Sequence, residues 1–297
     1  MKRFYGAHGP ATAWTVNSLL DGLPRVLLVT PDEARARALK CDLSAITWDK
    51  DVWEFPHRAS LPFEMVNRDL ESAAYRNWCL NRILSEEPGI FIISATALLQ
   101  SFLPIPWYHR FSRTIQAGDS MDRESIVAAL EEYGYLETAN VQEVGEYAIR
   151  GGKIDLYPAA AKNPIRVEFL ANTVNGIGFF CPVTQRSVEG NLSSLEIFPV
   201  REFLTWNELL HFSEKSEHEL TQCFKDFAHR REVPPRESIE VLKALQQEIT
   251  LPGIELYQHI LPLRWGSWLD IDIPTILIDE VDIIQEIELF HEIMNER

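Results

Sequence analysis

Two short stretches near opposite ends of the 297-residue sequence contain the residue types of a nucleotide site. Gly6 and Gly9 are three residues apart in YGAHGPATAW, and glycine-rich loops bind phosphate through backbone amides. Asp279 and Glu280 follow the apolar run TILI, and an acidic pair after a strand can hold Mg²⁺ and a water molecule. Together these residues predict the outline of a degenerate nucleotide site, although two ordinary turns explain them equally well.

The side chains that would carry out nucleotide chemistry are missing from the first stretch. A phosphate-binding loop reads G-x-x-x-x-G-K-[ST], with the lysine on the β- and γ-phosphates and the hydroxyl on Mg²⁺. In this register Thr12 stands at the lysine position and Ala13 at the hydroxyl position. Four scattered cysteines form no CxxC pair, which gives no zinc pattern. We therefore expect no ATPase activity, no catalytic residue, no cofactor and no metal.

A different kind of chemistry is indicated in the middle of the chain, where two arginines lie on alternating strands. In GEYAIRGGKIDLYP the apolar residues recur at every second position on both sides of a Gly-Gly pair, which predicts a hairpin next to Arg150. In PIRVEFLA the same alternation separates Arg166 and Leu170 from the core residues. Arginines beside an exposed leucine are typical of a protein-binding hot spot, and a solvated polar face with surface salt bridges is the alternative.

The elements that position these residues define an α/β fold with an insertion. Residues 1–117 alternate apolar strands with helices, which predicts a parallel sheet. Residues 118–202 read as one helix, with Asp122 as its N-cap, followed by strands, and predict an inserted α+β domain. Residues 203–297 return to helices and end in a buried strand, so we expect both chain ends to form one sheet.

Composition limits the partners and the compartment. The formal net charge is −16, which disfavours general DNA binding and favours either solubility or a basic protein partner. No apolar run reaches the length of a membrane span and no signal peptide opens the chain, so we expect a cytoplasmic protein. Between Gly145 and Arg186, however, the sequence contains five basic residues and three acidic ones, so this segment has a net positive charge.

Residues 134–187 closely resemble the UvrA-binding domain shared by UvrB and the transcription-repair coupling factor Mfd. The shared elements are GY, GE-Y-A-x-RGG-x-x-D-L-Y-P, P-x-R-V-E-F and TQRS. The stretches FPHRASLPFE, GIFIISATALLQSFLP and LPGIELYQHILP resemble the flanking, UvrB-like domain of Mfd, which has lost ATP binding. The long tyrosine-rich hairpin of UvrB has no counterpart in this sequence.

The resemblance implies a site for UvrA. Its arginines would be Arg150 and Arg166, and an aromatic pair that follows the second arginine in the family is Phe169 and Leu170 here. Leu170 replaces an aromatic residue, and Gly178 and Cys181 replace an arginine and an aspartate. The full set of expected UvrA-binding residues is Arg150, Arg166, Phe169, Leu170, Glu146 and Arg186.

The resemblance implies a non-catalytic adaptor that binds UvrA and couples stalled transcription to nucleotide excision repair. In the full factor, RNA polymerase and DNA are expected to contact other domains. An ATP-dependent helicase domain of UvrB type is one alternative, and a regulatory module that masks its own UvrA-binding face is another. The sequence is compatible with a fragment and with a stand-alone relative.

Overall fold

The computed structural model describes residues 6, 8–58, 69–230, 233–247, 258, 261 and 263–295. The chain divides into two compact units, and each is described by itself. The first unit combines Met1–Ala59, Cys79–Ser101 and Ser267–Arg297. The second unit combines Ser60–Trp78 and Phe102–Gly266.

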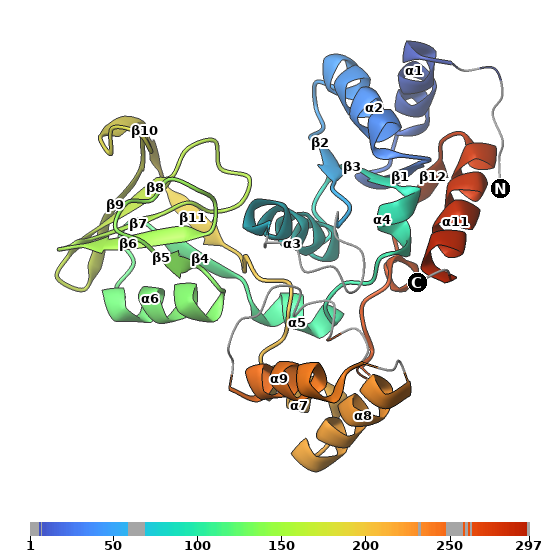
Figure 1. Ribbon diagram of the computed structural model, residues 1–297. Helices are drawn as coiled ribbons and strands as arrows, with labels where there is room; N and C mark the ends of the chain where they lie inside the picture. Colours follow the sequence, from blue (N-terminus) through green and yellow to red (C-terminus); the bar gives the residue numbers. More distant parts are fainter. Residues whose placement is uncertain are drawn as a thin grey trace. The chain divides into compact units, whose positions relative to one another are not determined.

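The first unit contains a four-stranded parallel sheet in the order β12-β1-β3-β2 (Figure 1). The pairing of β12 with β1 joins the two ends of the chain in one sheet, which confirms the predicted arrangement. The two central strands are continuous apolar runs, because a parallel sheet covered on both faces buries every side chain. The strands are β1 (Arg25–Thr30), β2 (Val52–Phe55), β3 (Gly89–Ser94) and β12 (Thr275–Leu277).

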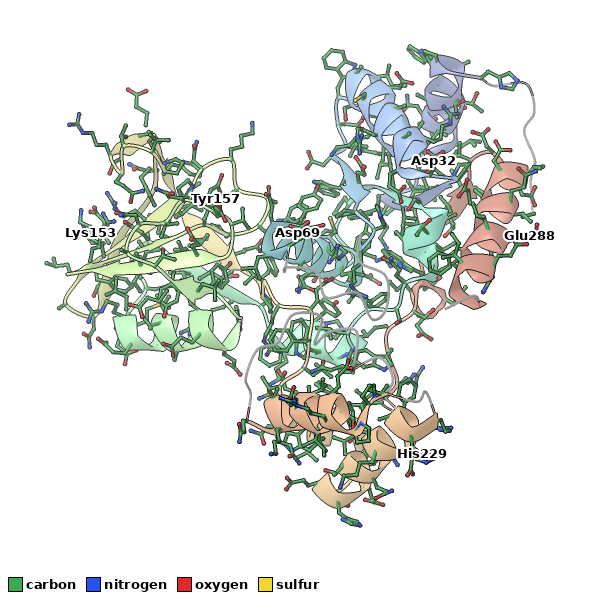
Figure 2. All side chains as sticks on the ribbon, viewed as in Figure 1. Asp32, Asp69, Lys153, Tyr157, His229 and Glu288 are labelled. Atoms are coloured by element: carbon green, nitrogen blue, oxygen red, sulfur yellow. The ribbon has the colours of Figure 1, made fainter. Side chains whose placement is uncertain are left out.

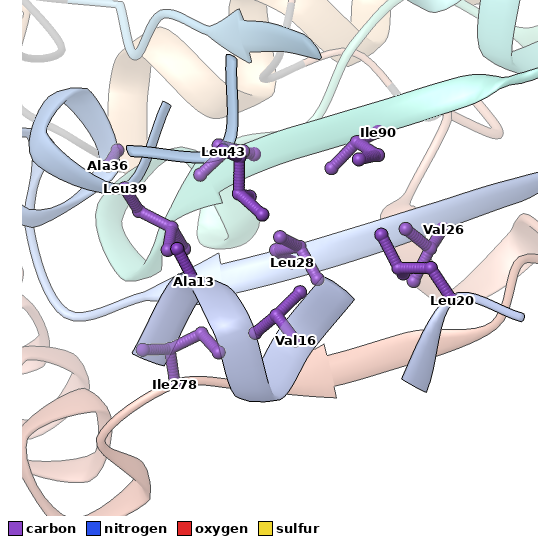
Figure 3. Close-up of a cluster of buried hydrophobic side chains, with 11 residues drawn as sticks. Ala13, Val16, Leu20, Val26, Leu28, Ala36, Leu39, Leu43, Ile90 and Ile278 are labelled. Carbon is purple, nitrogen blue, oxygen red and sulfur yellow. The ribbon is translucent and has the colours of Figure 1, made fainter. Parts of the chain in front are cut away.

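Helices α1 (Pro10–Leu19) and α2 (Glu33–Ile46) pack together on the core of this sheet (Figure 3). Helix α2 begins where the Asp32 side chain accepts the backbone N–H of Arg35 at 2.7 Å, which is an N-cap. Further helices of the unit are α4 (Ala95–Leu99), the 3-10 helix η1 (Trp268–Asp270) and α11 (Glu280–Asn295). The buried cluster consists of Ala13, Val16, Leu20, Val26, Leu28, Ala36, Leu39, Leu43, Ile90, Ile92 and Ile278.

The predicted burial of the last strand is wrong. Thr275 and Leu277 are exposed, the latter at 41%. Strand β12 lies at the edge of the four-stranded sheet, next to β1. An edge strand is covered less completely than the central strands, so an apolar run there does not become fully buried.

The second unit is built around a six-stranded sheet in the order β10-β9-β8-β7-β6-β5 (Figure 1). The neighbouring strands are antiparallel except for the parallel pair of β5 and β6. The predicted Gly-Gly hairpin is confirmed, since Arg150 pairs directly with Lys153. The strands are β5 (Leu136–Glu137), β6 (Glu146–Arg150), β7 (Lys153–Leu156), β8 (Ile165–Leu170), β9 (Thr173–Phe180) and β10 (Ser187–Leu192).

Helix α6 (Arg123–Glu132) lies against one face of this sheet. Asp122 caps it by accepting the backbone N–H of Ser125 at 3.2 Å, as predicted. The hydroxyl of buried Tyr147 on β6 donates to a carboxylate oxygen of Glu131 at 3.4 Å. Because side chains alternate along a strand, the residues on either side of Tyr147 point to the other face of the sheet.

The second unit also contains a buried polar cluster. Asn77 donates through Nδ2 to the carbonyls of Pro199 and Arg201 at 3.1 and 2.8 Å, and Arg76 forms a buried ion pair with Glu202.

The division into compact units does not follow the predicted domain boundaries at 117/118 and 202/203, which stay a prediction. The remaining helices and strands of the second unit are β4 (Arg113–Gln116), β11 (Ser194–Ile197), α5 (Ile105–Arg110), α7 (Trp206–Ser213), α8 (Glu217–Arg230), α9 (Pro235–Gln246) and part of α3 (Leu70–Leu84).

Candidate functional site

The sheet face opposite α6 carries both predicted arginines, and we call it the arginine face. Its side chains lie in rows set by the strand register. One row runs across four strands through Arg150, Lys153, Glu168 and Gly176. The next row contains Ala148, Asp155, Arg166 and Gly178. The prediction that Arg150 and Arg166 share one face is therefore confirmed by the register.

The prediction that Arg166 projects into solvent is wrong. Its Nε and Nη2 donate to the two carboxylate oxygens of Asp155 at 2.6 and 2.7 Å. The side chain of Asp155 is 0% exposed and that of Arg166 is 12% exposed. These hydrogen bonds from the guanidinium to Asp155 raise the pKa of Arg166. The bidentate pair with a fully buried carboxylate therefore holds the Arg166 guanidinium against the sheet and leaves little of it exposed.

Two further contacts explain why Arg166 is covered. Its guanidinium carbon lies 4.8 Å from the ring centroid of Phe180, which is within range of a cation–π interaction. Its Nη2 also reaches the carbonyl of Gln185 at 3.4 Å. Val141, Ala148 and Phe180 form a small buried cluster on this side of the sheet.

Arg150 is the more accessible of the two arginines. Its Nη2 donates to the carbonyl of Ala139 at 2.8 Å and to Oδ1 of Asn140, which holds the guanidinium beside the loop before β6. In the described part of the chain, Arg150 and exposed Arg186 form no salt bridge with a carboxylate. Both residues therefore keep a positive charge that a partner can neutralise.

Leu170 supplies the apolar component that the sequence predicts for this face. It is 72% exposed at the end of β8, next to Ala171, which has a φ of 54°. The neighbouring row contains an exposed ion pair between Lys153 and Glu168 at 2.5 Å; Lys153 is labelled in Figure 2. Phe169 is only partly exposed.

Glu146 has a local role, and Asp155 is the partner of Arg166 that the sequence analysis did not predict. The Oε2 atom of Glu146 accepts the backbone N–H groups of Gln142 and Glu143 at 2.7 and 2.9 Å, which stabilises the turn before β6. The signal for Asp155 was present, because alternation in KIDL places an acid on the same face as Arg150.

The predicted nucleotide residues lie in the first unit, and an arginine joins two of them. Gly9 is the N-cap position of α1, and Thr12 is buried one turn later. The Nη2 of Arg35 donates to Oγ1 of Thr12 at 3.0 Å, and its Nε donates to Oδ2 of Asp279 at 2.9 Å. The start of α1 and the end of β12 are thus linked by a cation from α2. Gly6 is exposed, and Glu280 is the first residue of α11.

We expect Arg35→Ala to lower the free energy of unfolding by about 1 kcal/mol without creating an ATP site. The bridge from Arg35 to Asp279 is partly exposed, and such ion pairs contribute little. Thr12 and Ala13 would still lack the amine and hydroxyl that bind nucleotide phosphates and Mg²⁺. Chemical denaturation and calorimetric titration with Mg²⁺-ATP measure both effects, and micromolar ATP affinity in either protein would contradict this interpretation.

The residues that the structure describes contain neither a metal-binding cluster nor a membrane-spanning helix. Within these residues, no group of three or more His, Cys, Asp or Glu side chains is arranged to hold a metal ion. None of the helices in the described ranges combines the length and the hydropathy needed to cross a bilayer.

Comparison with known proteins identifies the β-rich part of the second unit. Residues 114–203 match the family described as the UvrB interaction domain. The chain is 29% identical to the transcription-repair-coupling factor of Bacillus subtilis over 179 residues, which are 60% of this chain and 15% of that protein. It is 27% identical to that of Haemophilus influenzae over 234 residues, 79% of this chain and 19% of the relative.

A third relative, the transcription-repair-coupling factor of Myxococcus xanthus, is 27% identical over 273 residues, which are 89% of this chain and 20% of that protein. The structure and these matches define a chain that carries a UvrB interaction domain. More particularly, the chain is homologous to the N-terminal part of transcription-repair coupling factors, which confirms the resemblance seen in the sequence. It spans about a fifth or less of the length of these relatives.

Proposed function

We propose that this chain is a non-catalytic adaptor module that binds UvrA and so couples stalled transcription to nucleotide excision repair. The observation that carries the proposal is the UvrB interaction domain over residues 114–203, which contains the whole arginine face. In this proposal RNA polymerase and DNA are contacted by parts of the coupling factor other than these 297 residues.

Exposure separates contact residues from positioning residues among those predicted to bind UvrA. Arg150, Leu170 and Arg186 are accessible and are assigned to direct contact with UvrA. An arginine and a large apolar side chain are the residue types that contribute most at protein interfaces. Arg166 is assigned to positioning, because its guanidinium is bound to Asp155 and to the carbonyl of Gln185.

The charge of the face supports a partner surface with carboxylates. Lys153 and Glu168 compensate each other, as do Arg166 and Asp155. Arg150 on this face and exposed Arg186 between β9 and β10 keep positive charges in a chain of net charge −16. Complementary charges raise association rates and fix the orientation of docking more than they add affinity, so binding should weaken as salt increases.

We expect Arg150→Glu to weaken UvrA binding by about tenfold or more with an unchanged melting temperature. The reversed charge would face the carboxylates that the wild-type guanidinium attracts. Biolayer interferometry with purified UvrA measures the affinity. Arg236→Glu is the matched control, because Arg236 is an exposed arginine on α9 outside the family match.

The same titration can overturn the proposal in two ways. Wild-type affinity in Arg150→Glu would exclude docking through this face. No measurable binding of UvrA to the wild-type chain would exclude the adaptor function itself.

A further inference from the structure

Helix α11 carries apolar side chains on two opposite sides. One side packs against α4 and β1 in the first unit (Figure 1). The apolar residues that the fold covers, fully or in part, are Ile283, Ile287 and Phe290. The apolar residues that stay exposed, by 38 to 67%, are Val281, Ile284, Leu289 and Ile293. At about 100° per residue the two sets fall on opposite halves of the helix, and we call the exposed set the outer face of α11.

The packing of the first unit does not account for the outer face. A surface helix of a globular protein turns one apolar stripe to the core and polar residues to solvent, and the covered set already supplies that stripe. Val281 and Ile284, and again Leu289 and Ile293, are three or four positions apart and so are neighbours on the helix surface. Single exposed apolar residues are ordinary, but a group of them marks a site where another molecule binds. The outer face is therefore explained by a partner that covers it.

Charges on the same half of the helix indicate the chemistry of that partner. Asp282, Glu288 and Glu292 are exposed, and at about 100° per residue they alternate with the apolar residues of the outer face. Within the residues that the structure describes, none of these three carboxylates is in an ion pair. From Trp265 to Glu296 the sequence has nine acidic residues and no Lys or Arg. The segment thus has no Lys or Arg of its own to neutralise these carboxylates, and a basic partner would supply the cations.

The same carboxylates disfavour three other occupants. A second copy of this chain would bring its own outer face, and like charges brought together cost free energy. Nucleic acid and anionic lipid headgroups would be repelled for the same reason. An amphipathic helix fits, because apolar anchors three and four positions apart are the pattern by which helices dock. Lys or Arg beside the apolar stripe of that helix would meet the carboxylates.

We infer that the outer face of α11 is a docking site for an amphipathic helix of a partner protein, in which Lys or Arg residues flank the apolar stripe. The site lies in the first unit and outside residues 114–203, so it is separate from the arginine face. The inference goes beyond the proposed function and does not depend on the binding of UvrA.

A synthetic peptide of this chemistry tests the inference on the full chain. The probe is about three heptads long, with Leu at positions a and d and Lys at e and g, and fluorescence anisotropy measures its affinity. Ile284→Glu combined with Leu289→Glu should weaken binding by about tenfold or more, because two carboxylates would replace the apolar contacts. Trp48→Glu combined with Ile239→Glu is the matched control, since it makes the same change of charge at two exposed apolar residues outside α11. The control should bind within about threefold of wild type.

A charge exchange covers the case in which the first double variant does not fold. Glu288→Lys combined with Glu292→Lys changes only two exposed side chains. This variant should lose about tenfold in affinity for the Lys peptide and gain about as much for the same peptide with Glu in place of Lys. Far-UV circular dichroism with thermal melting shows whether each variant is folded.

The inference is overturned if the wild-type chain does not bind the Lys peptide, or if the α11 variants bind it as tightly as the matched control. Sedimentation velocity separates a second copy of this chain from the basic helix as the occupant. A concentration-dependent wild-type dimer that disappears in the Ile284→Glu and Leu289→Glu double variant would place a second copy on the outer face and overturn the inference. A monomer at all concentrations, with peptide binding lost in the α11 variants and kept in the control, supports it.

Discussion

Arg166→Ala should lower the free energy of unfolding of the second unit by about 3 to 5 kcal/mol. The substitution removes both hydrogen bonds to Asp155, whose side chain is 0% exposed. A carboxylate left alone in the interior has neither water nor a counter-charge, and that desolvation dominates the loss. Urea denaturation followed by circular dichroism measures the change.

A double variant separates the buried pair from general damage to the sheet. Arg166→Met combined with Asp155→Leu removes both charges and keeps apolar volume, so it should recover a large part of the lost stability. A loss of less than about 1 kcal/mol in Arg166→Ala would show that the pair is effectively solvent-exposed. In that case Arg166 would return to the set of contact residues, and its positioning role would be wrong.

Glu208→Ala should cause a loss of similar size, about 3 to 5 kcal/mol, from a different part of the second unit. The carboxylate of Glu208 accepts from Nη1 and Nη2 of Arg201 at 2.8 Å each. It also accepts from Nε1 of buried Trp107 at 3.1 Å and from the backbone N–H of Thr205 at 2.7 Å. The substitution would leave the buried guanidinium and the indole N–H without this acceptor. Glu217→Ala, at an exposed glutamate on α8, is the control and should stay within about 0.5 kcal/mol of wild type.

The pKa of Glu208 also leads us to expect that the stability of the fold depends on pH. Burial by itself raises the pKa of Glu208, but the hydrogen bonds and the charge of Arg201 outweigh it and hold the pKa below its ordinary value. A carboxylate with a lowered pKa in the folded state stabilises the fold above its unfolded pKa, about 4.3. This contribution is lost as the pH falls through the folded pKa. As the pH falls below about 4.3, the free energy of unfolding should decrease less in Glu208→Gln than in wild type. Denaturation at several pH values measures this, and an equal decrease in the two proteins would contradict the lowered pKa of Glu208.

Local patterns in the sequence predicted much of the fold. The alternation of Tyr147, Ile149, Ile154 and Leu156 around a Gly-Gly pair predicted the hairpin, and the structure pairs its strands across that turn. Asp122 was identified as a helix N-cap from its side-chain type and position alone. The sheet formed from both chain ends followed from the similar apolar runs at those ends.

The wrong predictions concern features that the alternation of apolar and polar residues does not encode. Alternation assigns Arg166 to a face of the sheet, but it does not tell which loops cover that face. The cover comes from the carbonyl of Gln185, nineteen residues further along the chain, and from the ring of Phe180. Likewise, an apolar run predicts a strand at Thr275–Leu277 but not its position at a sheet edge. The bridge from Arg35 to Asp279 joins residues 244 positions apart, which no local pattern indicates.

Hydrogen exchange of this chain with and without purified UvrA tests the central claim most directly. Binding through the arginine face should slow exchange in peptides that cover residues 148–156 and 168–180, where Arg150 and Leu170 lie. Peptides from α8 and α9 should exchange at the same rate in both samples. Slowed exchange confined to α8 and α9, or no change anywhere with UvrA in excess, would contradict the account.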